Sequence, residues 1–126
     1  MKEMIYSEKA PKPAGAYSQG VFADRLIFVS GQLPIDPATG KFVEKDIKKQ
    51  TRQIFKNIEQ VLAEKNAKIG DIVKLGVFLL NLNDFKEMNE VFQEFFNQYL
   101  PARTTVVVKE FPQNVLIEID AIALKS

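Results

Sequence analysis

The chain of 126 residues contains no cysteine and no histidine. Without cysteine it has no disulfide framework, no thiolate nucleophile and no zinc–thiolate site. Without histidine it lacks the commonest metal ligand and the commonest general base near neutral pH, which excludes a Ser-His-Asp triad and histidine-based nuclease chemistry. Any acid–base chemistry therefore has to come from Glu, Asp, Lys, Tyr, a terminal amine or water.

The chain also lacks an excess of charge of either sign. Lys and Arg total 17 and Asp and Glu total 16, so the net charge of +1 gives no electrostatic attraction to nucleic acid or to an anionic membrane. The N-terminus lacks the long apolar core of a signal peptide, and no apolar run approaches membrane-spanning length. We therefore expect a cytoplasmic protein that binds neither nucleic acid nor membrane. The length predicts one domain, residues 1–126.

The apolar pattern predicts strands and two helices in the order β-β-β-α-β-α-β-β, an α+β fold. Asp46 is expected to cap a first helix, and the 3.6-residue spacing of apolar side chains extends to about Lys65. Asp84, with Glu87 three residues later, predicts a capping box for a second helix that ends at Pro101 and buries Phe85 and Tyr99 among other aromatic residues. Residues 34–40 predict a surface loop. The predicted strands are residues 2–6, 17–23, 26–30, 72–80, 101–108 and 115–124.

The strand predicted over residues 72–80 is apolar on both faces. Two helices can cover only one face of the sheet, and a sheet whose other face met water would alternate more cleanly. We therefore expect the second face to be buried in a closed oligomer, with Arg103, Thr105 and Glu118 at or beside a subunit interface.

Glu118 and Arg103 are charged residues inside the two most apolar C-terminal strands. Because a buried carboxylate needs a partner, the two side chains either form a structural ion pair or belong to a functional site. In a site, the planar guanidinium of Arg103 would bind a small carboxylate through two hydrogen bonds. Glu118 would orient or activate water as a general base.

Other polar positions allow two interpretations each. Asn89 interrupts the aromatic stripe of the second helix, so its amide either ties down a backbone segment or faces a polar pocket. Ser30 and Gly31 end an apolar strand, where glycine permits the close approach of a ligand but is equally typical of a strand end. Tyr17 follows a loop rich in proline and glycine, and an aromatic residue there is usually part of the core.

Five segments of the sequence together resemble the reactive-intermediate deaminase (Rid, formerly YjgF) family, and the resemblance spans essentially the whole chain. The combination of a serine-glycine-glutamine, a proline-x-arginine and an isoleucine-glutamate segment in the order and spacing of the family is specific. The segments are residues 14–20 (AGAYSQG), 29–34 (VSGQLP), 83–92 (NDFKEMNEVF), 101–106 (PARTTV) and 117–123 (IEIDAIA).

The resemblance implies a chorismate-mutase-like fold, a mixed β-sheet with two helices packed on one face, in a homotrimer with a barrel core and a cleft between each pair of subunits. It implies hydrolysis of 2-imino acids, released by dehydratases acting on serine and threonine, to 2-oxo acids and ammonia, without metal or cofactor. It assigns Arg103 to the substrate carboxylate and Glu118 to water. The remaining substrate-binding positions that it implies are Tyr17, Ser30, Gly31, Phe85, Asn89 and Thr105.

Three positions depart from the family pattern. Ala16 replaces a frequent proline, Thr105 a frequent cysteine and Phe92 a frequent tyrosine, so substrate preference is less firmly implied than the use of Arg103 and Glu118. Two other functions stay open: a regulatory module that binds small carboxylates without turnover, and a ribonuclease or translation inhibitor, which the balanced charge and missing histidine disfavour.

Overall fold

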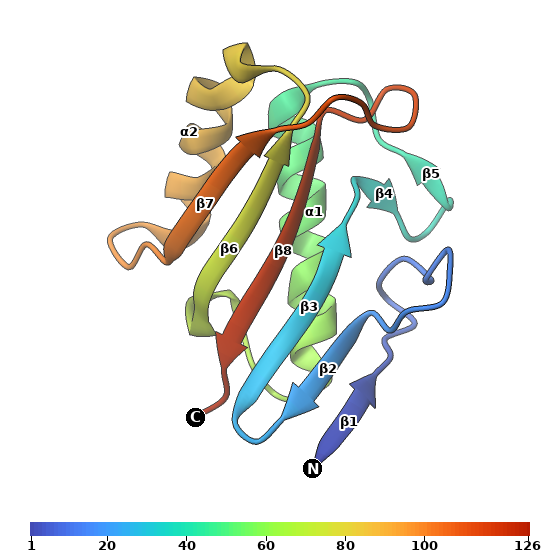
Figure 1. Ribbon diagram of the computed structural model, residues 1–126, viewed down its shortest axis with the longest axis vertical. Coiled ribbons are helices and arrows are strands. Elements are labelled where there is room, and N and C mark those ends of the chain that lie inside the picture. The colour runs from blue at the N-terminus through green and yellow to red at the C-terminus, as the bar shows by residue number, and fades with distance from the viewer.

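The computed structural model describes all residues 1–126 and contains a six-stranded mixed sheet with two helices on one face (Figure 1). All strand pairs are antiparallel except β6 with β7. This confirms the predicted α+β fold with its helices on one side. Across the sheet the strands are β1 (Lys2–Ile5), β2 (Gly20–Ala23), β3 (Leu26–Gln32), β8 (Ile117–Leu124), β6 (Ile72–Leu79) and β7 (Ala102–Val107).

The first helix, α1 (Ile47–Ala63), begins where it was predicted to begin. The Asp46 carboxylate accepts a hydrogen bond of 2.9 Å from the Lys49 amide, which satisfies one of the free donors at the helix N-terminus. One side of α1 packs on the sheet, and each of its fully buried apolar side chains contributes about 1.5–3 kcal/mol. The side chains with no exposed surface are Ile54, Phe55, Ile58, Val61 and Leu62.

The second helix, α2 (Phe85–Phe96), differs from the prediction at both ends. The Asp84 side chain makes no capping hydrogen bond, so the predicted capping box is wrong; a short 3₁₀ helix, Leu82–Asp84, precedes α2 instead. The helix ends before Pro101, because Asn97 adopts a φ of 54°, a conformation that terminates helices. Phe85 and Tyr99, predicted to be buried, are 37% and 79% exposed.

Two segments of the N-terminal half also differ from the prediction. Strand β2 begins at Gly20, and residues 17–19 belong to the preceding loop. Residues 34–40, predicted as a loop, include β4 (Ile35–Asp36), which pairs with β5 (Lys41–Phe42) in a small hairpin. The Asp36 carboxylate shapes this turn by accepting a hydrogen bond of 2.9 Å from the Ala38 amide.

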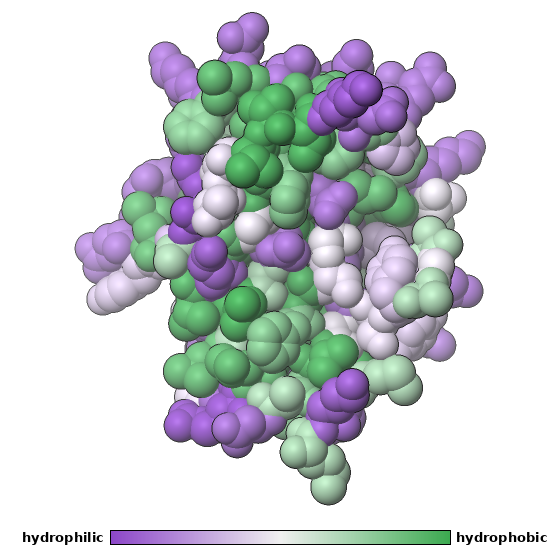
Figure 2. All heavy atoms as spheres, in the orientation of Figure 1, coloured by the Kyte–Doolittle hydropathy of each residue, from purple (hydrophilic) through white to green (hydrophobic).

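The face of the sheet opposite the helices is apolar over much of its area. Figure 2 shows this face, with apolar side chains gathered at both ends of the strands around a more polar centre. Five large apolar side chains on this face are between 36% and 46% exposed in the single chain: Leu26, Phe28, Val73, Val106 and Leu124. The burial of this face in an oligomer, expected from the sequence, stays a prediction.

None of the helices is long and apolar enough to cross a membrane.

Candidate active site

Arg103 and Glu118 do not form the ion pair that was considered from the sequence, because β6 lies between their strands. Arg103 is opposite Leu75 of β6, whose side chain is fully buried under the helices. Glu118 is opposite Phe78, three residues along β6 and therefore on the other face of the sheet. Strands β7 and β8 are about 10 Å apart, two strand spacings. One copy of the chain thus holds the two charges on opposite faces.

Arg103 is held by three side chains of α2. Its Nη1 donates a hydrogen bond of 2.6 Å to Oδ1 of Asn89. The guanidinium lies 5.3 Å from the ring centre of Phe85 and 4.9 Å from that of Phe92, within range of cation–π attraction. Burial lowers the pKa of Arg103 from its ordinary value, but an arginine stays charged in proteins. The guanidinium is therefore fixed in place with no carboxylate partner in the chain.

Of the two roles considered from the sequence, Asn89 takes the second: it lines a pocket together with Arg103 and does not tie down a backbone segment. Its amide oxygen is used to orient Arg103, so the interruption of the aromatic stripe has a side-chain cause. Thr105 lies two residues after Arg103 on the same face of β7. Its Oγ1 is buried without a hydrogen-bond partner, and no other side-chain nitrogen or oxygen of the chain is in that condition. Thr105 does not line the pocket that contains Arg103, so its expected contact with a substrate stays a prediction.

Glu118 lies beside a β-bulge in the neighbouring strand. In β3, Val29 pairs with Ala121 and Gln32 with Ile119, so Ser30 and Gly31 together stand opposite one residue of β8. Such bulges occur often beside active sites, where they redirect side chains. A Cβ atom at Gly31 would overlap Oε2 of Glu118, so only glycine leaves room for the carboxylate in its observed position.

The Glu118 carboxyl is half-buried and has neither a hydrogen bond nor an ion pair in the chain. Burial raises its pKa above the ordinary value, and the negative charge of Asp120, two residues on along the same face of β8, raises the pKa further. Nothing in the chain opposes these two effects. Glu118 is therefore a carboxyl that exchanges a proton closer to neutral pH than a solvated glutamate does.

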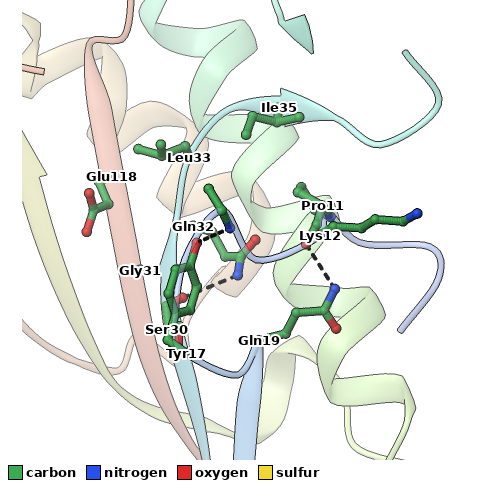
Figure 3. Close-up of a pocket in the computed structure, with 11 residues that line it drawn as sticks. Pro11, Lys12, Tyr17, Gln19, Ser30, Gly31, Gln32, Leu33, Ile35 and Glu118 are labelled. Carbon is green, nitrogen blue, oxygen red and sulfur yellow. Dashed lines mark hydrogen bonds between the residues drawn. The ribbon is translucent and has the colours of Figure 1, made fainter. Parts of the chain in front are cut away.

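Six of the eight predicted site residues line two separate cavities, whereas Phe85 and Thr105 line neither. A cavity of about 390 Å³ contains Glu118, Gly31, Ser30 and Tyr17, as Figure 3 shows. A second, of about 540 Å³, contains Arg103, Asn89 and Phe92. Each cavity has one half of the expected chemistry: the first has the proton acceptor, and the second has the cation.

Tyr17 and Ser30 make structural contacts at the first cavity. The Tyr17 hydroxyl accepts a hydrogen bond of 3.2 Å from the Ala14 amide, and the side chain is 52% exposed, not part of the core. The Ser30 hydroxyl donates to the carbonyl oxygen of Ser18 at 2.6 Å. Since this bond uses the only proton of the hydroxyl, the Ser30 side chain can accept a hydrogen bond from a ligand but cannot donate one.

Besides Gln32, which lines the Glu118 cavity and binds the Ser30 carbonyl at 3.3 Å, sequence reasoning missed three more deeply buried amide side chains that bind the backbone nearby. Gln19 binds the segment of residues 7–11, Asn57 binds the carbonyls of Leu33 and Ile35, and Gln50 binds Asn114 and Leu116 at the approach to β8. All three are at most 1% exposed. Gln50 and Asn57 lie on the buried side of α1. In the sequence, both could have been recognised as polar residues at positions where the 3.6-residue helical period expects apolar ones.

Comparison with known proteins places this architecture in a family. A sequence profile of the family described as endoribonuclease L-PSP matches residues 7–125. A RutC family protein of Pyrococcus abyssi is 52% identical, and the match covers 98% of each chain. A Yersinia pestis structure described as a conserved Rid family protein of unknown function has a TM-score of 0.93 at 40% identity, over 98% of this chain and 99% of that one. The chain belongs to the Rid family.

Two relatives in the Rid family bear on small-molecule chemistry. Reactive Intermediate Deaminase A, a chloroplast protein of Arabidopsis thaliana, is 42% identical over 97% of this chain and 65% of its own length. The crystal structure of E. coli TdcF with bound serine has a TM-score of 0.92 at 37% identity, over 98% of this chain and 99% of that one.

This Rid chain has no group of three or more acidic side chains that could hold a metal ion.

Proposed function

We propose that this protein hydrolyses 2-imino acids to 2-oxo acids and ammonia, and that two copies of the chain form each active site. Arg103 of one copy binds the substrate carboxylate, and Glu118 of another copy handles the attacking water. The homotrimer expected from the sequence would bring the two cavities together at each subunit interface.

One observation supports this proposal: each cavity contains a charged side chain without a partner of opposite charge. A ligand bound between the two cavities could contact both charged groups. Arg103 is fixed by Asn89 and two aromatic rings but has no anion. Glu118 is half-buried in a cavity without a cation partner and on the opposite face of the sheet. A small carboxylate with an electrophilic carbon would need both groups, which one copy cannot supply at one point.

The chemistry follows from these positions. With its carboxylate on Arg103, the substrate presents the C=N carbon to a water molecule held by the Glu118 carboxylate. As the water oxygen bonds to that carbon of the protonated imine, the C=N π electron pair moves to nitrogen and Glu118 accepts a proton from the water, giving a carbinolamine. Glu118 then returns that proton to the amine nitrogen, the C–N bond breaks with its electron pair leaving on ammonia, and the hydroxyl oxygen forms the C=O bond as its proton passes to the Glu118 carboxylate. A raised carboxyl pKa suits this two-way transfer.

The relatives support this choice of substrate class. A protein named as a reactive intermediate deaminase matches nearly all of this chain, and serine, a small carboxylate with an α-nitrogen, is bound in the TdcF crystal structure. The family description also names an endoribonuclease. The chain offers neither histidine nor a basic excess for that reaction, so imine hydrolysis is the better supported function.

The proposal is tested by measuring 2-oxo acid and ammonia release from freshly generated 2-iminopropanoate and 2-iminobutanoate. Wild type should accelerate release, and Arg103→Ala should lose the acceleration. Arg52→Ala is the matched control, since Arg52 is a surface arginine paired with Glu94 at 2.8 Å, and it should behave as wild type. Absence of acceleration by folded wild type would contradict the proposal for these substrates.

The second candidate is a module that binds small carboxylates without turnover, because a fixed arginine alone is sufficient for binding. Glu118→Gln separates the two functions. A deaminase loses turnover with this change but keeps its affinity for a 2-oxo acid, whereas a binding module shows no turnover in either form.

A further inference from the structure

Gln19 makes an unusual number of hydrogen bonds to a segment that lacks secondary structure. Its amide oxygen accepts from the Ser7 amide at 2.6 Å. Its amide nitrogen donates to the carbonyl oxygens of Ser7, Ala10 and Pro11 at 3.0, 3.5 and 2.9 Å. The side chain is 1% exposed, so these bonds form out of competition with water.

The segment of residues 8–17 depends on Gln19 for its position. The other hydrogen bonds that its residues make are local, among them Tyr17 N to Gly15 O and Ala14 N to the Tyr17 hydroxyl. The hydrogen bonds that connect it to a more distant part of the chain are those from the Gln19 amide nitrogen to Ala10 and Pro11. Without them, the segment would keep only its hydrogen bonds to the neighbouring Ser7 and the packing of Ala10 in the core.

This segment forms one wall of the Glu118 cavity. Pro11, Lys12, Ala14 and Tyr17 line the cavity from this side, and Figure 3 shows the hydrogen bond from the Gln19 amide to the Pro11 carbonyl. The opposite wall comes from the bulge in β3 and from Glu118.

The backbone beside the Gln19 side chain holds that opposite wall. The carbonyl oxygen of Gln19 accepts a hydrogen bond of 2.9 Å from the Ser30 amide, and the carbonyl of Ser18 accepts the Ser30 hydroxyl. Ser30 is the first residue of the bulge that places Gly31 against Glu118. One residue thus joins both walls, through its side chain on one side and its backbone on the other.

We propose that Gln19 is a positioning residue, whose amide fixes the width of the Glu118 cavity and so sets the affinity of the site for its ligand. The inference rests on the proposed function for the identity of that ligand, a small 2-imino or 2-oxo acid. Gln19 does not itself contact the reacting atoms, because its amide hydrogens and its oxygen are bound to backbone groups. Its loss should therefore weaken binding of substrate and product alike, raising KM more than it lowers kcat.

The test compares Gln19→Met, which keeps the length of the side chain without its hydrogen bonds, with Ile58→Val, a control that removes one methyl group from a fully buried position in α1. Four quantities are measured on the intact oligomer: deuterium exchange of residues 7–17, the Kd for 2-oxobutanoate, and the KM and kcat for 2-iminobutanoate. In Gln19→Met we expect faster exchange confined to this segment, a Kd and KM about tenfold higher and a kcat within about twofold of wild type. The control should change none of the site measurements.

Gln19→Leu provides a second variant that also lacks the hydrogen bonds of the amide and adds no buried charge beside the carbonyl oxygens of Ser7 and Pro11. Its Kd should rise as in Gln19→Met, and it is the variant to use if Gln19→Met does not fold. Unchanged exchange in the segment, or faster exchange with an unchanged Kd, would overturn the inference. The Kd measurement does not need turnover, so a wild type that binds 2-oxobutanoate without hydrolysing imines would refute the deaminase proposal and leave this inference testable.

Discussion

Gly31 lies directly against the carboxyl group of Glu118, on the bulged strand next to β8. A Cβ atom at position 31 would overlap Oε2 of Glu118. The space for the carboxylate therefore exists only because residue 31 has no side chain. The bulge at Ser30 and Gly31 brings the two residues together by opposing two residues of β3 to one of β8.

Gly31→Ala should displace the Glu118 carboxylate and lower kcat by about 100-fold, the usual scale for misplacing a general base. The fold should survive, because Glu118 is half-buried and its side chain can rotate. The control is Gly70→Ala, where a new Cβ would meet no atom within 4 Å. Activity and thermal unfolding are measured for both. Full activity in Gly31→Ala would show that the position of Glu118 does not matter.

Asn89→Ala should raise KM with a smaller change in kcat, because it removes the hydrogen bond that orients Arg103. The charge-assisted bond is worth about 1.5–3 kcal/mol. Since Phe85 and Phe92 still hold a partly exposed guanidinium, we expect about a tenfold rise in KM, toward the low end of that range. Glu87→Ala, an exposed change on the same helix, should leave KM unchanged. Equal KM values for the two variants would contradict the role assigned to Asn89.

Glu118→Gln should stabilise the folded protein at neutral pH while abolishing turnover. The pKa of Glu118 is raised in the folded state, so the folded protein binds more protons than the unfolded chain between the ordinary and the raised pKa. The stability of wild type therefore falls as pH rises through that window. Tm measured against pH should show the variant above wild type at neutral pH and the two converging below the ordinary pKa of glutamate. A variant less stable than wild type at neutral pH would mean that Glu118 gains a stabilising partner in the oligomer.

Asp120→Asn should move the acidic limb of the rate profile toward lower pH. In the proposed mechanism the limb arises because Glu118 must be ionised to activate water. Removing the negative charge of Asp120 removes the second cause of its raised pKa, so Glu118 stays ionised to a lower pH. The measurement is kcat/KM against pH for wild type and variant. A limb that does not move would show that Asp120 has no influence on the catalytic carboxyl.

The sequence predicted well those features that depend on local pattern. The 3.6-residue period and Asp46 predicted α1, and the apolar runs predicted the strands that carry Arg103 and Glu118. The end of α2 was wrong because Asn97 terminates the helix through its backbone conformation, which composition does not reveal.

The arrangement of the site could not be derived from order along the chain. Arg103 and Glu118 lie in consecutive strands of the sequence, which left a direct ion pair open as one of two interpretations. In the sheet, β6 lies between β7 and β8 and pairs in parallel with β7. The strand order and the register of these pairs place the Arg103 and Glu118 side chains on opposite faces. The role of Gln19 depends likewise on a contact between distant segments.

The most direct test of a site shared between copies is complementation between two inactive variants. Arg103→Ala and Glu118→Gln are coexpressed in equal amounts, and the whole population of mixed and unmixed oligomers is purified and assayed for 2-imino acid hydrolysis. If each site takes Arg103 from one copy and Glu118 from another, about one site in four is intact after random mixing, and about a quarter of wild-type activity should return. If the mixed oligomers are as inactive as either variant alone, both residues act within one copy or the reaction does not use them together, and the account is contradicted.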